Sequence, residues 1–370
     1  MKQKPKVRFV NKDKNKFFPT LKNRVDEYFA QQELSRHANG TMVLKTVVLL
    51  CAYILPFVFI LLFNPPFWLS TLLWLVMGLG IAGIGMSVMH DANHGAYSPN
   101  ETINKWMGRS INLAGGGVLN WKLQHNVLHH MYTNVVPMDE DIQDRLVVRL
   151  SPHTKVRGIH RFQWIYAFFF YGILTLYWVV GKDFVQHVSF INSGVNTQTR
   201  RENTMTLIKL ILMKAVYFWV FFYVPVYIFG LPFGEILAGF LFMHFTAGLV
   251  LTVIFQLAHT VEGTDHPQPN EDGIIENDWA IHQLQTTVNF SRRNKWLSWY
   301  VGGLNFQVEH HLFPRICHVH YPSIAPIVKQ TAEEFGLVYL ENETFNEALS
   351  SHVSTLRRFG KLPDWNEAIG

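Results

Sequence analysis

The sequence has few cysteines and few charged residues for its length. Cys51 and Cys317 are the only cysteines among 370 residues, which excludes a disulfide framework and a thiolate metal site. Charged residues make up 16% of the chain, against about 25% in an average soluble domain. The length would allow two or three soluble domains, but the low charge and the long apolar runs predict a single membrane-embedded unit.

The sequence also has no internal repeat, no low-complexity linker and no pattern of a cleavable signal peptide, because its first apolar run begins late, near residue 43, and is too long. No nucleic-acid partner is expected. The net charge is +5, and many basic residues precede the first apolar run: Lys2, Lys4, Lys6, Arg8, Lys12, Lys14, Lys16, Lys22 and Arg24. Two interpretations stay open for them, a solvated tail or an anchor on anionic headgroups, where each would contribute about 1 kcal/mol.

Four apolar runs are close to the length of about 20 residues that crosses a bilayer. They cover residues 46–63, 67–89, 207–230 and 236–258. The turn Asn64-Pro65-Pro66 joins the first two runs, and residues 231–234 join the last two. We therefore expect two helical hairpins.

The basic loops predict which side of the membrane each segment occupies. Short loops rich in Lys and Arg stay in the cytoplasm, so the N-terminus, residues 90–206 and the region after His259 are expected inside. An even number of spans must then separate His130 from His259, yet three apolar runs lie between them. The run 162–181 is rich in Trp and Tyr, which suits an interfacial or re-entrant helix. The predicted fold is an all-α membrane protein with four transmembrane helices in two hairpins, an interfacial helix and a cytoplasmic helical cap that holds a metal site.

Histidine is unusually frequent, with 18 residues, and four groups of histidines lie beside apolar segments. The members are His90 and His94; His125, His129 and His130; His259; and His310 and His311, which follow Gln307. Residues four apart share a face of a helix. We therefore expect His90 and His94 to point at one place, His125 and His129 to do the same with His130 offset, and Gln307 to share a face with His311.

Eight histidines on the predicted cytoplasmic side indicate a metal centre, although a lone histidine at a helix end is more often only hydrogen-bonded. Structural zinc usually takes four ligands, so eight imidazoles suit two metal ions. Imidazole binds zinc, copper, iron and nickel, and the spacing leaves the metal open. Asp91 and Glu309 could orient imidazoles as outer hydrogen-bond acceptors. For residues 139–141, a solvated acidic loop is the favoured interpretation.

These motifs resemble the three histidine boxes of the membrane fatty acid desaturases, in the family's order. The matching segments are His90-Asp91-Ala92-Asn93-His94; His125 to His130 with Met131-Tyr132-Thr133-Asn134; and Gln307-Val308-Glu309-His310-His311-Leu312-Phe313-Pro314. Gln256-Leu257-Ala258-His259 matches the place where the family supplies one more histidine. The resemblance covers residues from about 40 to 340 and is strongest to bacterial acyl-lipid or linoleoyl-CoA (delta-6) desaturases.

The resemblance implies a cytoplasmic cap with two ferrous ions, dioxygen as co-substrate, and insertion of a cis double bond into an acyl-lipid or acyl-CoA. The implied ligands are His90, His94, His125, His129, His130, His259, His310 and His311. Gln307 stands where many family members have histidine, as in the front-end subgroup, and would bind metal directly or through water. The chain has no His-Pro-Gly-Gly haem motif, so the implied electron donor is a separate ferredoxin or cytochrome b5-like protein.

The predicted domains are a basic cytoplasmic segment (1–42), a membrane desaturase domain (43–340) and a cytoplasmic tail (341–370). The expected location is the inner membrane of a bacterium. One rival function is a hydroxylase or ketolase that uses the same di-iron boxes. Another is a zinc-binding hydrolase or a metal transporter, although a transporter should hold its metal near the bilayer midplane.

Several residues outside the boxes keep two interpretations. His244, inside the fourth span, would line a substrate tunnel or make a structural hydrogen bond. His282 would lie near the metal or on the surface, and the basic residues of 145–161 would bind a phosphate or form a plain loop. His318 and His320 are expected on the cap surface, and Trp121 in packing.

Overall fold

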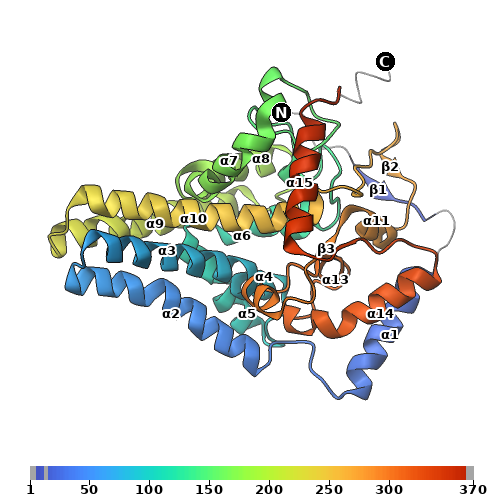
Figure 1. The fold of residues 1–370 in the computed structure, drawn as a ribbon, viewed down its shortest axis with the longest axis horizontal. Coiled ribbons are helices and arrows are strands. Elements are labelled where there is room, and N and C mark those ends of the chain that lie inside the picture. Colours follow the sequence, from blue (N-terminus) through green and yellow to red (C-terminus); the bar gives the residue numbers. More distant parts are fainter. Residues whose placement is uncertain (1–5, 12–15, 364–370) are drawn as a thin grey trace.

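The computed structural model describes residues 6–11 and 16–363 (Figure 1). The expected basic residues Lys2, Lys4, Lys12 and Lys14 lie outside these ranges. The described chain is mostly helical, as the composition predicts. Its α-helices are α1 (Phe17–Gln31), α2 (Gly40–Phe63), α3 (Phe67–Gly83), α4 (Met89–His94), α5 (Glu101–Gly108), α6 (Val118–Lys122), α7 (Gln163–Tyr177), α8 (Asp183–Asn192), α9 (Arg200–Phe218), α10 (Phe233–His259), α11 (Trp279–Thr286), α12 (Lys295–Tyr300), α13 (Gln307–Leu312), α14 (Tyr321–Glu334) and α15 (Phe345–Phe359).

Four long helical rods, α2, α3, α9 and α10, extend toward one end of the molecule, and the shorter helices of the cap gather at the other (Figure 1). Helix α2 stops at Asn64, whose left-handed backbone (φ 41°) turns the chain before the two prolines. Helix α10 begins directly after Pro232. Pro232 is the cap residue before this helix, and its extended backbone (ψ 125°) turns the chain into the first helical turn.

Wide π-helical turns continue several of these helices. They are Ile84–Val88 between α3 and α4, Leu123–His129 after α6, Trp178–Lys182 between α7 and α8, and Trp219–Ile228 after α9. Such turns use hydrogen bonds between residues five apart and are often found at functional sites. The turn Ile84–Val88 leads into α4, which carries His90 and His94, and the turn Leu123–His129 contains His125 and His129.

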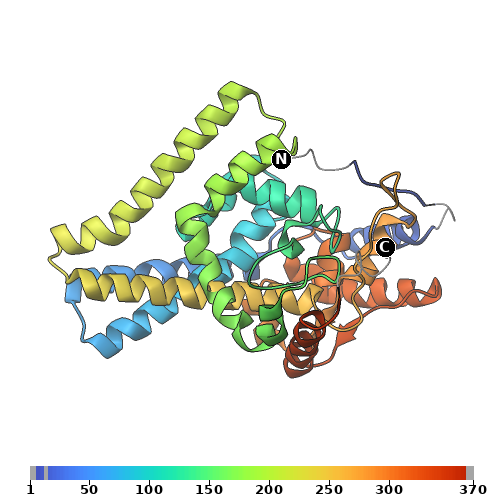
Figure 2. The same ribbon diagram turned by 90° about the horizontal axis from the view of Figure 1, so that it is seen from above.

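Five described helical segments are long and apolar enough to cross a membrane: Gly40–Phe63, Phe67–His94, Gly158–Asn192, Arg200–Ile228 and Phe233–His259. The protein is therefore a membrane protein, but length and composition alone do not confirm four spans. The additional segment, Gly158–Asn192, contains the run that the sequence predicts as interfacial. Figure 2 shows that this segment is an arc formed by α7 and α8, in contrast to the straight rods beside it.

Helix α10 lies between α3 and α7 and packs closely against both. A Cβ atom at Gly78 of α3 would lie 2.6 Å from the carbonyl oxygen of Met243, and one at Gly248 would lie 2.5 Å from that of Gly172. Only glycine permits these two close approaches of backbones. Small residues commonly allow such contacts between membrane helices.

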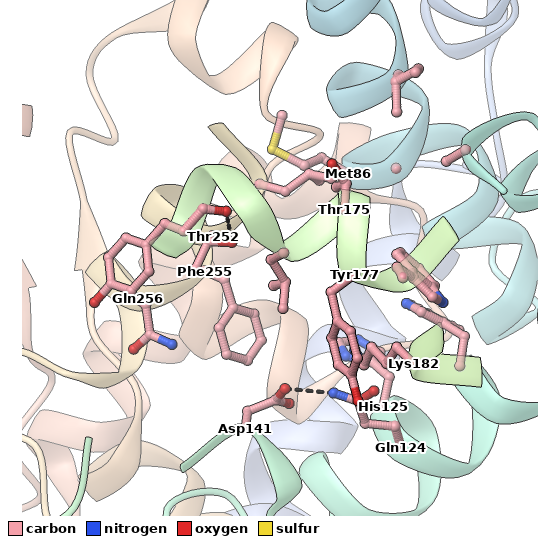
Figure 3. Close-up of a pocket in the computed structure, with 18 of the residues that line it drawn as sticks. Met86, Gln124, His125, Asp141, Thr175, Tyr177, Lys182, Thr252, Phe255 and Gln256 are labelled. Atoms are coloured by element: carbon pink, nitrogen blue, oxygen red, sulfur yellow. Dashed lines mark hydrogen bonds between the residues drawn. The ribbon is translucent and has the colours of Figure 1, made fainter. Parts of the chain in front are cut away.

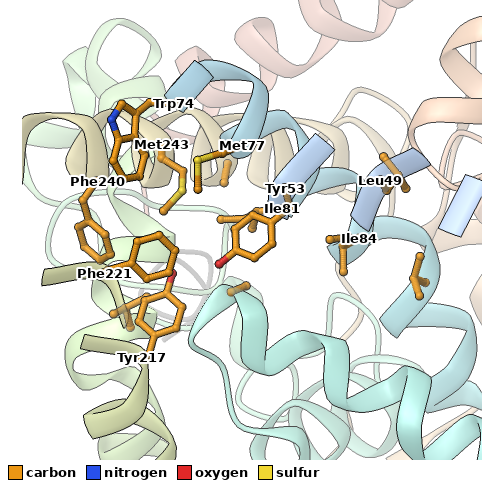
Figure 4. Packing of buried hydrophobic residues seen from close by; sticks show 14 of the residues in the cluster. Leu49, Tyr53, Trp74, Met77, Ile81, Ile84, Tyr217, Phe221, Phe240 and Met243 are labelled. Atoms are coloured by element: carbon orange, nitrogen blue, oxygen red, sulfur yellow. The ribbon is translucent and has the colours of Figure 1, made fainter. Parts of the chain in front are cut away.

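The core of the long helices is rich in aromatic side chains (Figure 4). Tyr53 of α2, Trp74 of α3, Phe221 and Phe240 are buried together. The rings of Trp74 and Phe221 are 6.3 Å apart, and those of Phe221 and Phe240 are 5.5 Å apart. This cluster fixes the rods against one another at the end away from the histidines.

The cap is made of segments from both ends of the sequence. Helix α1 packs against α14 through a core that includes Phe17, Leu21 and Ile324. The strand β1 (Arg8–Phe9) pairs in parallel with β2 (Ile274–Ile275), and β3 (Asn289–Phe290) pairs in parallel with β4 (Glu341–Asn342). Helix α15, from the segment predicted as a tail, packs against α7 and α10.

Candidate metal centre

The first histidine group lies on α4, at the end of the second rod. His90 and His94 are one helical turn apart, and their ring centroids are 4.8 Å apart. Gly95 ends this helix with a left-handed backbone (φ 78°), which glycine adopts without strain. The predicted convergence of these two side chains is confirmed.

The second group differs from the expectation. The sequence predicts that His125 and His129 point together and that His130 is offset, and this is wrong in the structure. Residues 123–129 form a π-helical turn, and the amide of His130 donates to the carbonyl of His125. In such a turn residues five apart share a face, so Nε2 of His125 lies 3.2 Å from Nε2 of His130, and His129 points to a different place.

The third group and His259 come from opposite sides of the cap. His259 is the last residue of α10, and Gln307, His310 and His311 lie on the short helix α13. The side-chain amide of Gln307 lies 2.9 Å from Nε2 of His259. A close approach holds this region in place, because a Cβ atom at Gly302, just before α13, would clash with the carbonyl of Met86.

The eight histidines form two clusters with one histidine between them. We call His90, His94, His125 and His310 the first cluster, and His129, His259 and His311 the second cluster; in each, one ligand atom per residue lies within 4.8 Å of the others. His130 forms a further group of the same kind with His310 and His311, one residue from each cluster. Every predicted histidine ligand is therefore brought to one place.

The donor atoms fit metal ions. Nε2 of His94, His129, His310 and His311 is buried and has no hydrogen-bond partner among the described residues. Nε2 of His90 and Nε2 of His125 lie 3.1 Å apart, and two nitrogens that bind one ion at about 2.1 Å would be separated by roughly 3 Å. A buried nitrogen without a partner costs about 1–3 kcal/mol, so these atoms are arranged for ligands and not for one another.

Outer hydrogen bonds orient the rings of the second cluster. Nδ1 of His129 lies 3.1 Å from Asp139, Nδ1 of His311 lies 2.8 Å from the side-chain oxygen of Gln283, and Nδ1 of His259 lies 3.3 Å from the carbonyl of Thr286. Such contacts fix which nitrogen faces a metal ion.

The carboxylate of Asp139 is buried, which corrects the expected solvated loop at 139–141. The loop folds inward because this carboxylate accepts from the amides of Asn134 and Asp141 as well as meeting His129. Burial raises the pKa of Asp139, but His129 outweighs it and holds the pKa of that carboxyl below its usual value. The negative charge is thus kept at the outer side of the second cluster.

A different network lies behind the first cluster. Asp91 lies 3.7 Å from Nδ1 of His90 and 2.8 Å from Nδ1 of His318, and Nε2 of His318 lies 2.6 Å from the ammonium of Lys45. His318 and His320 are buried, which corrects their expected place on the surface. Asp91 and Lys45 draw the ring of His318 inward, and Nε2 of His320 meets the carbonyl of His37 at 2.9 Å.

The Glu309 carboxylate makes no hydrogen bond or ion pair with a histidine ring of the described residues, although its sequence position suggested that it could. Its carboxylate accepts from the Asn289 amide (2.8 Å) and the Tyr339 hydroxyl (2.7 Å). Burial raises the pKa of Glu309, and these two donors oppose that change. The residue therefore ties α13 to the neighbouring strand β3.

A cavity of about 440 Å³ reaches the histidines from the side of α7 (Figure 3). His90, His125 and Gln307 line it, together with mostly apolar side chains such as Ile84 and Phe255. Its volume lies in the range of roughly 300–1,000 Å³ typical of ligand pockets. The cavity exposes two rings of the first cluster and none of the second.

Comparison with known proteins decides the family. The model of the fatty acid desaturase family matches residues 66–342. The sn-1 linoleoyl-lipid 6-desaturase of Arthrospira platensis is 35% identical over 94% of both chains, and that of Synechocystis sp. is 35% identical over 96% of this chain and 98% of its own. The acyl-lipid (8-3)-desaturase of Physcomitrium patens is 32% identical over 97% of this chain and 74% of its own.

The chain belongs to the fatty acid desaturase family. It is an oxidoreductase of lipid metabolism. The family and the names of the relatives support a desaturase and not the rival hydroxylase or ketolase.

For several other residues of this desaturase, the position in the structure differs from the expected one or decides between two interpretations. Trp121 does not only pack: it lines the cavity, and its ring stacks on His125 at 4.5 Å. His244 does not line this cavity, and its Nε2 lies 2.9 Å from the Tyr217 hydroxyl. His282 is buried, with its ring 4.9 Å from that of Phe9. Gln283 was missed, because an isolated glutamine carries no recognisable spacing.

The basic loop 145–161 is held together by one buried arginine, Arg149. Arg149 is buried and donates to the carbonyls of Pro152, Thr154 and Phe359, among others near the end of α15. Arg157 pairs with Asp144. Of the arginines in this loop, Arg145 alone lines the cavity.

Proposed function

We propose that this protein is a front-end acyl-lipid desaturase that uses dioxygen and two iron ions to place a cis double bond in a fatty acyl chain. The first cluster would hold one iron and the second cluster the other, with His130 between them. Gln307 would complete the second cluster, directly or through a water molecule. The observation that carries this proposal is the convergence of eight imidazoles, of which His94, His129, His310 and His311 have a buried Nε2 without a hydrogen-bond partner among the described residues.

The division of labour between metal and protein follows from the chemistry. Bound iron would supply the activation of dioxygen and the removal of hydrogen from an unactivated methylene, which no side chain can perform. The residues of the chain orient the imidazoles, exclude water and hold the acyl chain. Placement matters, because an error of about 1 Å can reduce the rate on the order of a hundredfold.

The cavity supports an acyl substrate. Apolar side chains from α3, α7 and α10 line most of it, and it reaches His90 and His125. A fatty acyl chain in this space would pass beside the first cluster. The similar proteins named as acyl-lipid desaturases support a lipid-bound substrate, and Gln307 at the start of the third box supports front-end chemistry.

A four-span arrangement is supported by the position of His259. The rings of His129 and His259 are 4.7 Å apart, which supports a placement of both residues on the same side of the membrane. If α9 and α10 both cross, the segment Gly158–Asn192 cannot cross as well. Its exposed Phe162, Ile165 and Val185 suit a helix that lies in the interface.

The orientation and the partner follow the same proposal. The basic loops favour a cytoplasmic cap in a bacterial inner membrane. Electrons would come from a separate ferredoxin or cytochrome b5-like protein.

The proposal is tested by making the protein in a bacterial host fed linoleic acid and analysing the lipids by gas chromatography with mass spectrometry. We expect a new double bond between the existing ones and the carboxyl end, and none with the His125→Ala variant. A hydroxylated product, or a double bond on the methyl side, would contradict it. Elemental analysis of the purified protein should find iron; two zinc ions without iron would also contradict it.

A further inference from the structure

The cavity beside the first cluster has one strongly polar end. Asp141, Arg145 and Lys182 line it there together with Gln124, the residue that precedes His125. Figure 3 shows Lys182, Gln124 and Asp141 grouped around His125, away from Met86 and Thr252. The charged groups of the cavity therefore lie close to the candidate metal centre and not at the distant end of the apolar part.

Two of these three charged groups already have partners. The Asp141 carboxylate accepts from the side-chain amide of Gln124, and the guanidinium of Arg145 donates to the carbonyl of Glu140 at 3.0 Å. Burial raises the pKa of Asp141 and so does Asp139, whereas the positive charges of Lys182 and Arg145 oppose the rise. Lys182 and Arg145 thus act on the same carboxyl group.

Lys182 is different, because its ammonium makes no hydrogen bond or ion pair with any described residue. It lies half-buried in the cavity wall, 5.2 Å from the centre of the Trp178 ring, in the π-helical turn between α7 and α8. Three N–H donors in a half-buried cavity wall are costly unless an acceptor meets them. The cavity therefore lacks one acceptor, at a place beside the metal centre.

We propose that the ammonium of Lys182 binds the carbonyl oxygen of the acyl substrate and so fixes the position of the new double bond from the carboxyl end. This proposal rests on the proposed function. The carbonyl end would sit at the polar end of the cavity, and the methyl end would extend among Ile84, Ile173 and Leu251. Because the polar end adjoins His125, carbons near the carboxyl group would face the first cluster.

The shared chemistry is an acyl carbonyl, which a glycerolipid ester, a coenzyme A thioester and a free fatty acid all carry. The test compares the wild type with Lys182→Met and Lys182→Arg in membranes of the producing host, using each of the three substrates. Lys155→Met is the matched control, because Lys155 is exposed and lies outside the cavity. The readouts are KM, kcat, the double-bond position by mass spectrometry, and the iron content.

For Lys182→Met we expect a loss of about tenfold in kcat/KM, because a charge-assisted hydrogen bond disappears, with a rise in KM and a mixture of double-bond positions. Lys182→Arg keeps a donor and should keep mostly one position, and Lys155→Met should behave as the wild type. Iron content should be unchanged in all three variants.

Three results would overturn the proposal. One is a Lys182→Met enzyme that makes the single wild-type isomer with an unchanged KM. A second is a loss confined to the coenzyme A thioester, which would point to the phosphates of the carrier. A third is a loss of iron, which would give Lys182 a role in the metal centre. A wild type without any desaturation would instead contradict the proposed function itself.

Discussion

The two histidine clusters use the same side chain but have different surroundings. In the second cluster, each Nδ1 meets an acceptor within 3.3 Å, and one acceptor is the buried carboxylate of Asp139. In the first cluster, Nδ1 of His310 lies 3.3 Å from the Tyr321 hydroxyl, whereas the carboxylate of Asp91 is 3.7 Å from His90 and is bound more closely to His318. Only the first cluster has rings, those of His90 and His125, in the wall of the cavity.

This difference shows how one metal centre can both leave room for a substrate and hold its ligand rings in place. A metal site beside a substrate must leave room on one side, and its rings cannot be enclosed by hydrogen-bond partners. A site behind it can be fixed by partners on every side. We therefore expect the second cluster to depend on individual outer contacts, and the first to depend mainly on the fold around it.

The largest effect is expected from removing a ligand from either cluster. His129→Ala and His125→Ala should each lose about one iron ion per chain, because a site of three or four ligands loses one. Desaturation should fall by more than the roughly 100-fold that a lost outer partner can cost. Iron analysis and product analysis measure both. A variant with full iron and normal activity would remove that histidine from the centre.

The next effect tests the outer carboxylate. Asp139→Asn should weaken iron binding or activity by about 10–100-fold, since the amide cannot supply the negative charge beside His129. Asp144→Asn, in the same loop but exposed and paired with Arg157, is the control and should change little. An Asp139→Asn enzyme that matches this control would show that the two clusters do not differ in this way.

A third variant tests the network behind the first cluster. His318→Ala leaves Asp91 and Lys45 buried without the ring between them, so we expect a loss of roughly 3–5 kcal/mol in stability with iron content largely kept. Thermal unfolding in detergent and iron analysis separate the two effects. His320→Ala, which removes one contact to a carbonyl, should destabilise the protein less. Loss of iron at unchanged stability would assign the network to the metal.

The smallest effect concerns Gln307. Gln307→Ala should lower kcat by roughly three- to tenfold, because the amide makes one neutral contact near His259. Gln307→His should restore or retain iron binding, since imidazole is the better ligand. The comparison of the two variants by iron titration and steady-state rates checks this; an unaffected Gln307→Ala enzyme would place the amide outside the centre.

The sequence predicts the apolar helices and the histidine set because both are local patterns. Runs such as 236–258 follow from composition, and the spacing of His90 and His94 follows from an ordinary helix. The places where it fails depend on distant contacts. The burial of Asp139 depends on Asn134 and His129, and that of His318 on Lys45, which lies 273 residues earlier.

The sequence also fails where the helical period departs from that of an α-helix. Reading the segment 123–130 as an α-helix paired His125 with His129, whereas its wider turn pairs His125 with His130. No residue type in this segment predicts a π-helical turn. Composition also leaves the number of membrane crossings open, because the segment Gly158–Asn192 is apolar enough to cross, and the argument against its crossing depends on the distant residue His259.

The wide turn at Leu123–His129 has a consequence for how the chain tolerates change in length. Each residue of an α-helix turns the side-chain direction by about 100°, and each residue of this wider turn by somewhat less. Deleting one residue between Gln124 and Leu128 would therefore change the directions of the imidazoles of His129 and His130. The two rings would then no longer meet the groups that they meet now. Insertions and deletions in this stretch of seven residues should therefore abolish the metal centre.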